Sequence, residues 1–210
     1  MIHLPTRPLL FVVSAPSGAG KTTLCERLLA EFDNLVYSVS CTTRAPREGE
    51  EDGVNYHFLT RDAFEKKITA GDFLEHAIVH GNLYGTLRSE ITDAFARGKN
   101  VLMDIDVQGA KQIRNFLAAT RDDDPLRCGF VDIFIVPPSL EVLQKRLVAR
   151  AKDSEAVIAR RVEHAANELK HWQDYRFVIV NDRLDASYDA LRSIYIAEQH
   201  ANFAVTASRK

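Results

Sequence analysis

The sequence predicts an α/β fold, a three-layer core around a central parallel sheet, and two observations lead to that prediction. Apolar runs of strand length recur along the chain without polar alternation, which is typical of parallel strands buried on both faces. Segments with helical apolar spacing separate the runs, and the first run passes through a glycine-rich turn into one of these segments.

Four apolar runs are expected to form the sheet: residues 9–13, 101–106, 131–138 and 177–182. Three helices are predicted from apolar stripes. The first carries Leu24, Leu28 and Leu29 on one side, the second starts after the N-cap candidate Ser139, and the last is the C-terminal one. The stripes of the second and last helices are Leu140, Leu143 and Leu147, and Leu184, Tyr188, Leu191 and Tyr195.

Two regions depart from a simple strand–helix repeat. Residues 37–88 hold short alternating segments rich in Gly, Arg, Tyr and Glu, which predict a small β-rich insertion. Residues 146–164 predict two helices around the charged turn AKDSEA, an appendage suited to a mobile lid. The expected division is a core of residues 1–36, 89–145 and 168–210, an insertion at 37–88 and a lid at 146–167. Residues 121–127, RDDDPLR, are expected to be a solvated loop.

Composition limits the class of protein. The 210 residues suit one large domain, and 46% apolar residues suffice for a buried core. A net charge of −2 gives no overall basic field for nucleic acid. The three cysteines form no metal or disulfide pattern, and residues 1–8 lack signal-peptide features. We therefore expect a cytoplasmic protein that binds neither nucleic acid nor membrane, with helix faces compatible with a homo-oligomer.

The stretch APSGAGKT, residues 15–22, follows the first strand and matches the phosphate loop G-x-x-x-x-G-K-[ST], except that Ala15 replaces the first glycine. Backbone N–H groups at the start of a helix bind phosphate, Lys21 would reach the β and γ phosphates, and the Thr22 hydroxyl would bind Mg²⁺. The competing interpretation is a simple glycine-rich connection. Residues predicted to hold a nucleotide are Ala15, Pro16, Ser17, Gly18, Ala19, Gly20, Lys21 and Thr22.

A second pattern identifies a resemblance. The stretch SVSCTTRAPREGEEDGVNYHF, residues 38–58, has two arginines three apart, a G-E-x-x-G turn and Tyr56, and it resembles guanylate kinase. The similarity continues through FLEHAIVHGNLYGT, VLMDIDVQGA, VPPSLEVLQKRLVAR and VIVND, from about residue 10 to residue 195. The resemblance implies Mg²⁺-dependent transfer of the γ-phosphoryl group of ATP to GMP, giving ADP and GDP.

The resemblance also implies a GMP site. Arg44, Arg47, Tyr56 and Tyr84 would hold the 5′-phosphate, and guanidinium forks suit such a dianion. Glu75 would accept the guanine N1–H and N2–H₂ groups, while Ser40 and Thr86 would offer hydroxyls to O6. Gly85 belongs to the same predicted site. Without the flanking pattern, these residues would be interpreted as ordinary surface groups.

Asp104 and Asp106 interrupt an apolar strand, where alternation would place both carboxylates on one face. Buried charge is costly unless it is used, and ligands of α/β sheets bind at this end. The resemblance implies contacts to guanine and to the water shell of Mg²⁺, with a capping role for one aspartate left open. The residues Gln108 and Gly109 are expected to turn the chain.

Arg146 and Arg150 lie four residues apart and would share a helix face. In guanylate kinases, lid arginines close over the triphosphate, and Arg146, Arg150 and Arg161 are in the matching positions, with Arg160 on another face. Ala151 stands where the family commonly has glycine. Asn181 would lie beside the adenine of ATP, and a turn-forming role is its alternative.

The implied catalytic residues are Lys21, Arg44, Arg146 and Arg161. The GMP phosphate is itself an anionic nucleophile, so no histidine is needed as a base. Two other hypotheses remain: a guanylate-kinase-like module that only binds, and a related kinase for another phosphorylated acceptor. Lys21, Thr22 and the lid arginines argue against the first, and Ser40, Glu75 and Thr86 argue against the second.

Overall fold

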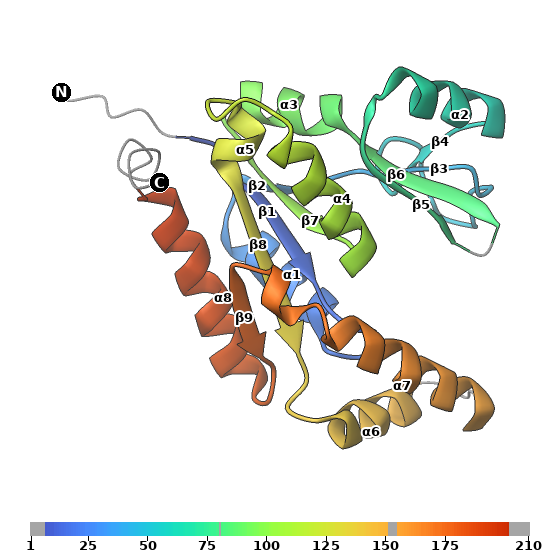
Figure 1. Ribbon diagram of the computed structural model, residues 1–210, viewed down its shortest axis with the longest axis vertical. Helices are drawn as coiled ribbons and strands as arrows, with labels where there is room; N and C mark the ends of the chain where they lie inside the picture. The colour runs from blue at the N-terminus through green and yellow to red at the C-terminus, as the bar shows by residue number, and fades with distance from the viewer. Residues whose placement is uncertain (1–6, 80, 151–154, 202–210) are drawn as a thin grey trace.

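The computed structural model describes residues 7–79, 81–150 and 155–201, without the side chain of Arg150. The larger of its two sheets has the strand order β2-β7-β1-β8-β9, and every neighbouring pair is parallel. This confirms the predicted α/β fold with a central parallel sheet (Figure 1). The strands are β1 (Leu10–Ser14), β2 (Leu35–Tyr37), β7 (Asn100–Asp104), β8 (Phe130–Val136) and β9 (Phe177–Val180).

Helices cover both faces of this sheet, which explains why its strands are apolar throughout. Successive residues of β1 face opposite sides, so Phe11 and Val13 pack with one group of helices and Leu10 and Val12 with the other. The first face is covered by α1 (Lys21–Glu31) and α8 (Leu184–Gln199), and the second by α3 (Arg88–Ala96), α4 (Val107–Ala118) and α5 (Pro125–Gly129).

The predicted stripe of the last helix is mostly confirmed. Tyr188, Leu191 and Tyr195 are buried in the core, where the ring of Tyr195 meets that of Phe11 edge-on. Leu184, the first residue of α8, is 40% exposed and does not take part in this packing. The stripe therefore covers the sheet from its second turn onward.

The β-rich insertion forms a second, four-stranded sheet in the order β4-β3-β6-β5. Figure 1 shows it to one side of the large sheet. Its strands are β3 (Cys41–Thr42), β4 (His57–Phe58), β5 (Phe73–Val79) and β6 (Asn82–Leu87). The insertion also contains α2 (Arg61–Ala70), which the sequence analysis missed. Thr60 caps the start of this helix and Gly71, at φ 70°, its end, so the signal was present.

Three predictions about polar segments are wrong. The expected loop 121–127 contains the start of α5, because Asp124 accepts the Leu126 N–H at 2.8 Å and Pro125 fits the first helical position. The strand expected at 101–106 ends at Asp104. Asp106 instead caps α4 by accepting the Gly109 N–H at 2.8 Å, so Gln108 and Gly109 continue into a helix rather than a turn.

Two helices follow β8 at the end toward which β8 and β9 point (Figure 1). The first is α6 (Leu140–Arg150), capped by Ser139 as predicted, and the second is α7 (Glu155–Leu169). Leu143, Leu147 and Ala165 are buried between them. The 3₁₀ turn η1 (Trp172–Asp174) then leads to β9. The charged turn between α6 and α7, with Ala151, lies outside the described residues.

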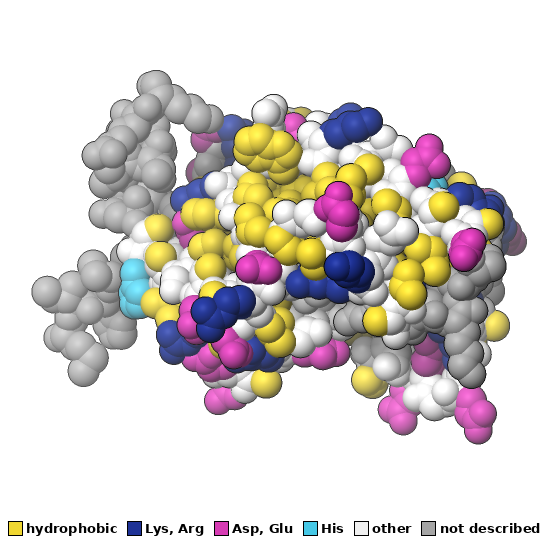
Figure 2. Space-filling model, turned by 90° about the horizontal axis from the view of Figure 1, so that it is seen from below, with side chains coloured by type: hydrophobic (Ala, Val, Ile, Leu, Met, Phe, Trp, Pro, Cys, Tyr) yellow, Lys and Arg dark blue, Asp and Glu magenta, His cyan; other side chains and the backbone are white. Residues whose placement is uncertain are grey.

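Seen from the end where α6 and α7 lie, hydrophobic side chains gather among scattered acidic and basic ones (Figure 2). Exposed hydrophobic residues at this end include Leu140 and Val148 on α6 and Val180 at the end of β9. Among the described residues, no helix combines the length and apolar character needed to cross a bilayer.

The fold contains a buried acidic group whose contribution to stability can be measured. Asp132 on β8 is 3% exposed and accepts from Arg114 Nη1 at 2.8 Å and from the Arg176 N–H at 2.9 Å. Asp132→Ala would leave a half-buried guanidinium without its anion, so we expect the free energy of unfolding to fall by about 3 kcal/mol in urea titrations. The matched change at exposed Asp93 should stay within about 0.5 kcal/mol. Equal effects at both positions would contradict this role of Asp132.

Candidate active site

The carboxyl ends of the parallel strands bring the predicted site residues together. β1 leads into the phosphate loop, β7 ends at Asp104, and β9 ends just before Asn181. Because these strands are neighbours or near neighbours in one sheet, the three ends meet at one edge, where ligands of α/β folds bind.

The phosphate loop depends on two glycines with left-handed backbone angles. Gly18 has φ 90° and Gly20 has φ 96°. A Cβ added to Gly18 would come within 2.9 Å of Leu147, and one added to Gly20 within 2.3 Å of Asn181 Nδ2. The loop is therefore held closely on both sides. Ala15, in the position of the usual first glycine, is buried in the core beneath the loop.

One predicted phosphate donor already has a partner. The Ala19 N–H donates to the Pro16 carbonyl at 3.0 Å inside the loop, so it closes the turn. Lys21 begins α1, and its ammonium donates to the Ile105 carbonyl at 3.0 Å and forms an ion pair with Asp104. Thr22 follows in the first turn of α1 with an exposed side chain.

Asn181 joins the phosphate loop to the helices beyond it. Its Nδ2 donates to the Ala19 carbonyl at 2.7 Å, and its side chain is buried. Its own carbonyl accepts from Arg146 Nη2 at 2.9 Å. Arg161 on α7 donates to Ser17 Oγ at 2.8 Å. Both arginines, placed by sequence in the lid, thus lie at the phosphate loop.

Of the two remaining lid predictions, the structure confirms one and leaves the other untested. Arg160 is exposed, and its Nε donates within α7 to the Ala156 carbonyl at 3.4 Å, so it lies on a different face from Arg161. The side chain of Arg150 lies outside the described residues, and its predicted contact stays a prediction.

A cavity of about 240 Å³ opens between the two sheets. Asp104, Ile105 and Asp106 reach it from the end of β7. The small sheet contributes residues of β5, β6 and the adjoining loops. They are Ser40, Asn55, Tyr56, Glu75, Ala77, Val79, Tyr84 and Gly85, and Tyr37 completes the wall.

Two polar side chains of the cavity wall, Glu75 and Ser40, are linked through Thr86, which is buried behind the wall. Thr86 Oγ1 donates to Glu75 Oε1 at 2.8 Å, and Ser40 Oγ lies 3.2 Å from Thr86 Oγ1. A hydroxyl has one proton, and Thr86 gives its proton to Glu75, so Ser40 is the donor in the second bond. Burial, reinforced by the nearby Asp106, raises the pKa of Glu75 to about 7.

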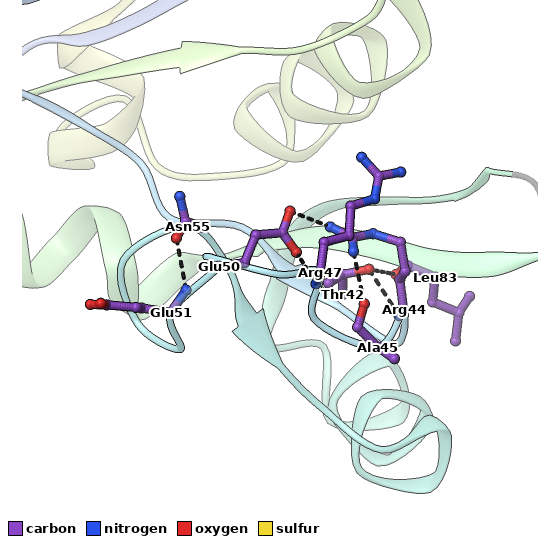
Figure 3. Close-up of polar contacts among 8 residues, drawn as sticks. All are labelled: Thr42, Arg44, Ala45, Arg47, Glu50, Glu51, Asn55 and Leu83. Carbon is purple, nitrogen blue, oxygen red and sulfur yellow. Dashed lines mark hydrogen bonds and ion pairs between the residues drawn. The ribbon is translucent and has the colours of Figure 1, made fainter.

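Arg44 is held in place by a carboxylate that the sequence analysis named only as part of a turn. Glu50 Oε1 accepts from Arg44 Nη2 at 2.8 Å, and Glu50 Oε2 accepts from the Arg47 N–H at 2.7 Å (Figure 3). The Glu50 carboxylate raises the pKa of Arg44, and Arg44 in turn lowers that of Glu50. The Arg44 guanidinium carbon lies 5.5 Å from the centre of the Tyr56 ring, whose own centre is 6.0 Å from that of Tyr84. Three of the four predicted phosphate-binding residues are therefore together.

The sequence analysis missed several residues of the site. Tyr37, Asn55, Ala77, Val79 and Ile105 line the cavity, and no spacing rule marks them, because they meet only through the packing of two sheets. Glu50 could have been found, since an acidic residue in an arginine-rich turn is a natural ion-pair partner.

The phosphate loop gives a matched pair of glycine substitutions. Gly20→Ala and Gly98→Ala both force an L-residue into a left-handed conformation, at about 1–2 kcal/mol. Only Gly20 would also displace Asn181, since nothing lies within 4 Å of a Cβ on Gly98. We expect thermal unfolding to show a larger loss of stability for Gly20→Ala than for Gly98→Ala. Gly20→Ala should also weaken binding of the predicted nucleotide at the phosphate loop. Similar losses for the two variants would contradict the close packing of Gly20 on Asn181.

The raised pKa of Glu75 predicts a pH-dependent stability. Between about pH 4.5 and 7 the folded protein keeps a proton on Glu75 that the unfolded chain releases, so this group lowers stability as pH rises. Glu75→Gln lacks this titrating group. We therefore expect the unfolding free energy of the variant minus that of the wild type to rise by about 2–3 kcal/mol from pH 4.5 to pH 8. Exposed Glu163→Gln is the control. A constant difference across that range would contradict the prediction.

Comparison with known proteins agrees with this geometry. The family model described as guanylate kinase matches residues 7–198. Guanylate kinases of Sphingopyxis alaskensis and Alkalilimnicola ehrlichii are each 46% identical, over 94% and 91% of this chain and 86% and 89% of their own lengths. The crystal structure of guanylate kinase from Anaplasma phagocytophilum superposes with a TM-score of 0.70 and 34% identity, covering 95% of this chain and 90% of that one. The chain is an enzyme of the guanylate kinase family.

Proposed function

We propose that the protein transfers the γ-phosphoryl group of ATP to GMP, with Mg²⁺, and releases ADP and GDP. The observation that carries this proposal is the cavity between the sheets, whose wall contains Tyr56, Tyr84 and the pair Glu75 and Ser40, linked through the buried Thr86. In this proposal residues 37–88 bind GMP, residues 146–167 form the lid, and the remaining core binds ATP.

Guanine recognition follows from the donors and acceptors that are available. The Glu75 carboxylate can accept the N1–H and N2–H groups of guanine. Thr86 already gives its proton to Glu75, so Ser40 is the hydroxyl that can turn its proton from Thr86 to O6. Adenine has no N1–H and would set a lone pair against Glu75, and a buried polar group left unpaired rejects a wrong base strongly.

The acceptor phosphate would be bound at the Arg44 end of the site. Arg44 keeps N–H groups beyond the two that bind Glu50 and the Ala45 carbonyl, and the Arg47 guanidinium points away from Glu50 (Figure 3). The hydroxyls of Tyr56 and Tyr84 can add neutral donors. Glu50 fixes Arg44 beforehand, which reduces the ordering cost of binding.

The donor nucleotide would bind at the phosphate loop. Lys21 and the free N–H groups of the loop would hold its phosphates, and the exposed Thr22 hydroxyl and the carboxylates of Asp104 and Asp106 are oxygen donors of the kind that Mg²⁺ prefers. Bound Mg²⁺ would neutralise charge on the phosphates. Asn181 donates from Nδ2 to the Ala19 carbonyl, and its Oδ1 could accept a hydrogen bond from the adenine amine.

Catalysis would rest on positioning and positive charge. Phosphoryl transfer needs in-line alignment and cations around the moving group, and Lys21, Arg44, Arg146 and Arg161 can supply that charge. The acceptor phosphate is already an anion, so no general base is assigned. His57 lies 3.6 Å from Glu90, a structural pairing away from the phosphate loop.

The test is turnover with ATP and Mg²⁺, offering GMP, AMP, UMP and CMP in parallel. We expect ADP and GDP from GMP alone. Glu75→Gln should raise KM for GMP by at least tenfold, because a side-chain amide cannot accept both N–H groups, while KM for ATP changes less than about twofold. Equal use of several acceptors by the wild type, or unchanged GMP turnover in Glu75→Gln, would overturn the assignment.

A further inference from the structure

The strand that carries Glu75 has an open edge. β5 is the last strand of the small sheet, and its only strand neighbour among the described residues is β6. In an antiparallel pair the backbone groups of every second residue point away from the partner strand, and those of His76 do so, since both bind a side chain outside the sheet. Such edge groups need other partners when they are covered.

A glutamine of the core supplies both partners. Gln112 on α4 accepts the His76 N–H through Oε1 at 3.1 Å and donates from Nε2 to the His76 carbonyl at 2.9 Å. One side-chain amide thus imitates a neighbouring strand. Since α4 packs on the large sheet and β5 belongs to the small one, this pair of bonds joins the two halves of the cavity.

The same junction sets the position of Glu75 directly. Gly109, one turn before Gln112, lies so close to β5 that an added Cβ would be 3.2 Å from Glu75 Oε2. Leu74, the neighbour of Glu75, is buried among core residues of α4 such as Ile113. Asp106, the other carboxylate at this end of the cavity, caps the same helix.

We propose that Gln112 is a positioning residue for base recognition: its two bonds to His76 fix β5 against α4 and thereby set the position of Glu75 in the proposed guanine site. This inference rests on the proposed GMP site and adds a residue that does not itself line the cavity. If Gln112 only closed a strand edge, its loss would affect stability without singling out GMP.

The test replaces Gln112 with methionine, which has similar length and cannot form either bond. We expect Gln112→Met to raise KM for GMP about tenfold and to leave kcat and KM for ATP within about twofold. Because the effect acts through Glu75, adding Gln112→Met to Glu75→Gln should change KM for GMP by less than about twofold more. Asn115→Ala, at an exposed amide on the same helix, is the control and should resemble the wild type.

Three outcomes would overturn the proposal: a wild-type KM for GMP in Gln112→Met, an equal rise of KM for ATP, or an undiminished effect in the Glu75→Gln background. Amide hydrogen exchange of the unaltered protein covers the case in which Gln112→Met does not fold. The His76 N–H should exchange as slowly as amides inside the small sheet. Exchange as fast as that of loop amides would exclude the hydrogen bond from His76 to Gln112. Failure of the wild type to phosphorylate GMP would instead bring down the proposed function, so the two failures are distinguishable.

Discussion

The anchoring of the phosphate loop by Asn181 is the interaction on which the rest of the site depends. One residue at the end of β9 donates through its side chain to the Ala19 carbonyl, accepts from Arg146 and is itself fixed by an N–H bond to Val136 at 2.7 Å. Gly20 can approach this closely only because it lacks a Cβ. The loop, an arginine of α6 and two sheet strands therefore share one reference point.

The proposed acceptor site has the opposite energetic character, since it includes Glu75, a group that weakens the fold. Glu75 is 8% exposed, has one hydrogen-bonded hydroxyl and lies near the acidic Asp106. An ionised carboxylate in this position costs stability, which a guanine base with two N–H donors would restore. Glu50, by contrast, is compensated in advance by Arg44 and the Arg47 N–H. In the proposed site, the residues for the phosphate are thus organised before binding, whereas an ionised Glu75 would gain its compensating donors only from the base.

The sequence could predict the large sheet because burial on both faces produces unbroken apolar runs, and it could predict the loop because GKT follows one of them. It could not decide whether Asp106 belongs to a strand or caps a helix, since D-I-D satisfies both patterns until the spacing of Val107, Ala110 and Ile113 is considered. The ion pair of Glu50 with Arg44 is local to one arginine-rich turn and was within reach of the sequence. The partner of Gln112 was not, because its bonds to His76 join α4 to a strand of the other sheet.

The cavity is lined by residues of both sheets, so the few polar contacts between the sheets have a large influence on its geometry. Asp104 ends β7 of the large sheet and Lys21 begins α1, which covers that sheet, while Glu75 and Thr86 come from the small sheet. Hydrophobic contacts hold the sheets together but tolerate sliding, since dispersion and burial have little directional preference. Hydrogen bonds with defined angles do not tolerate it. The two hydrogen bonds of Gln112 to His76 therefore add a directional constraint between α4 and β5 that burial alone does not supply.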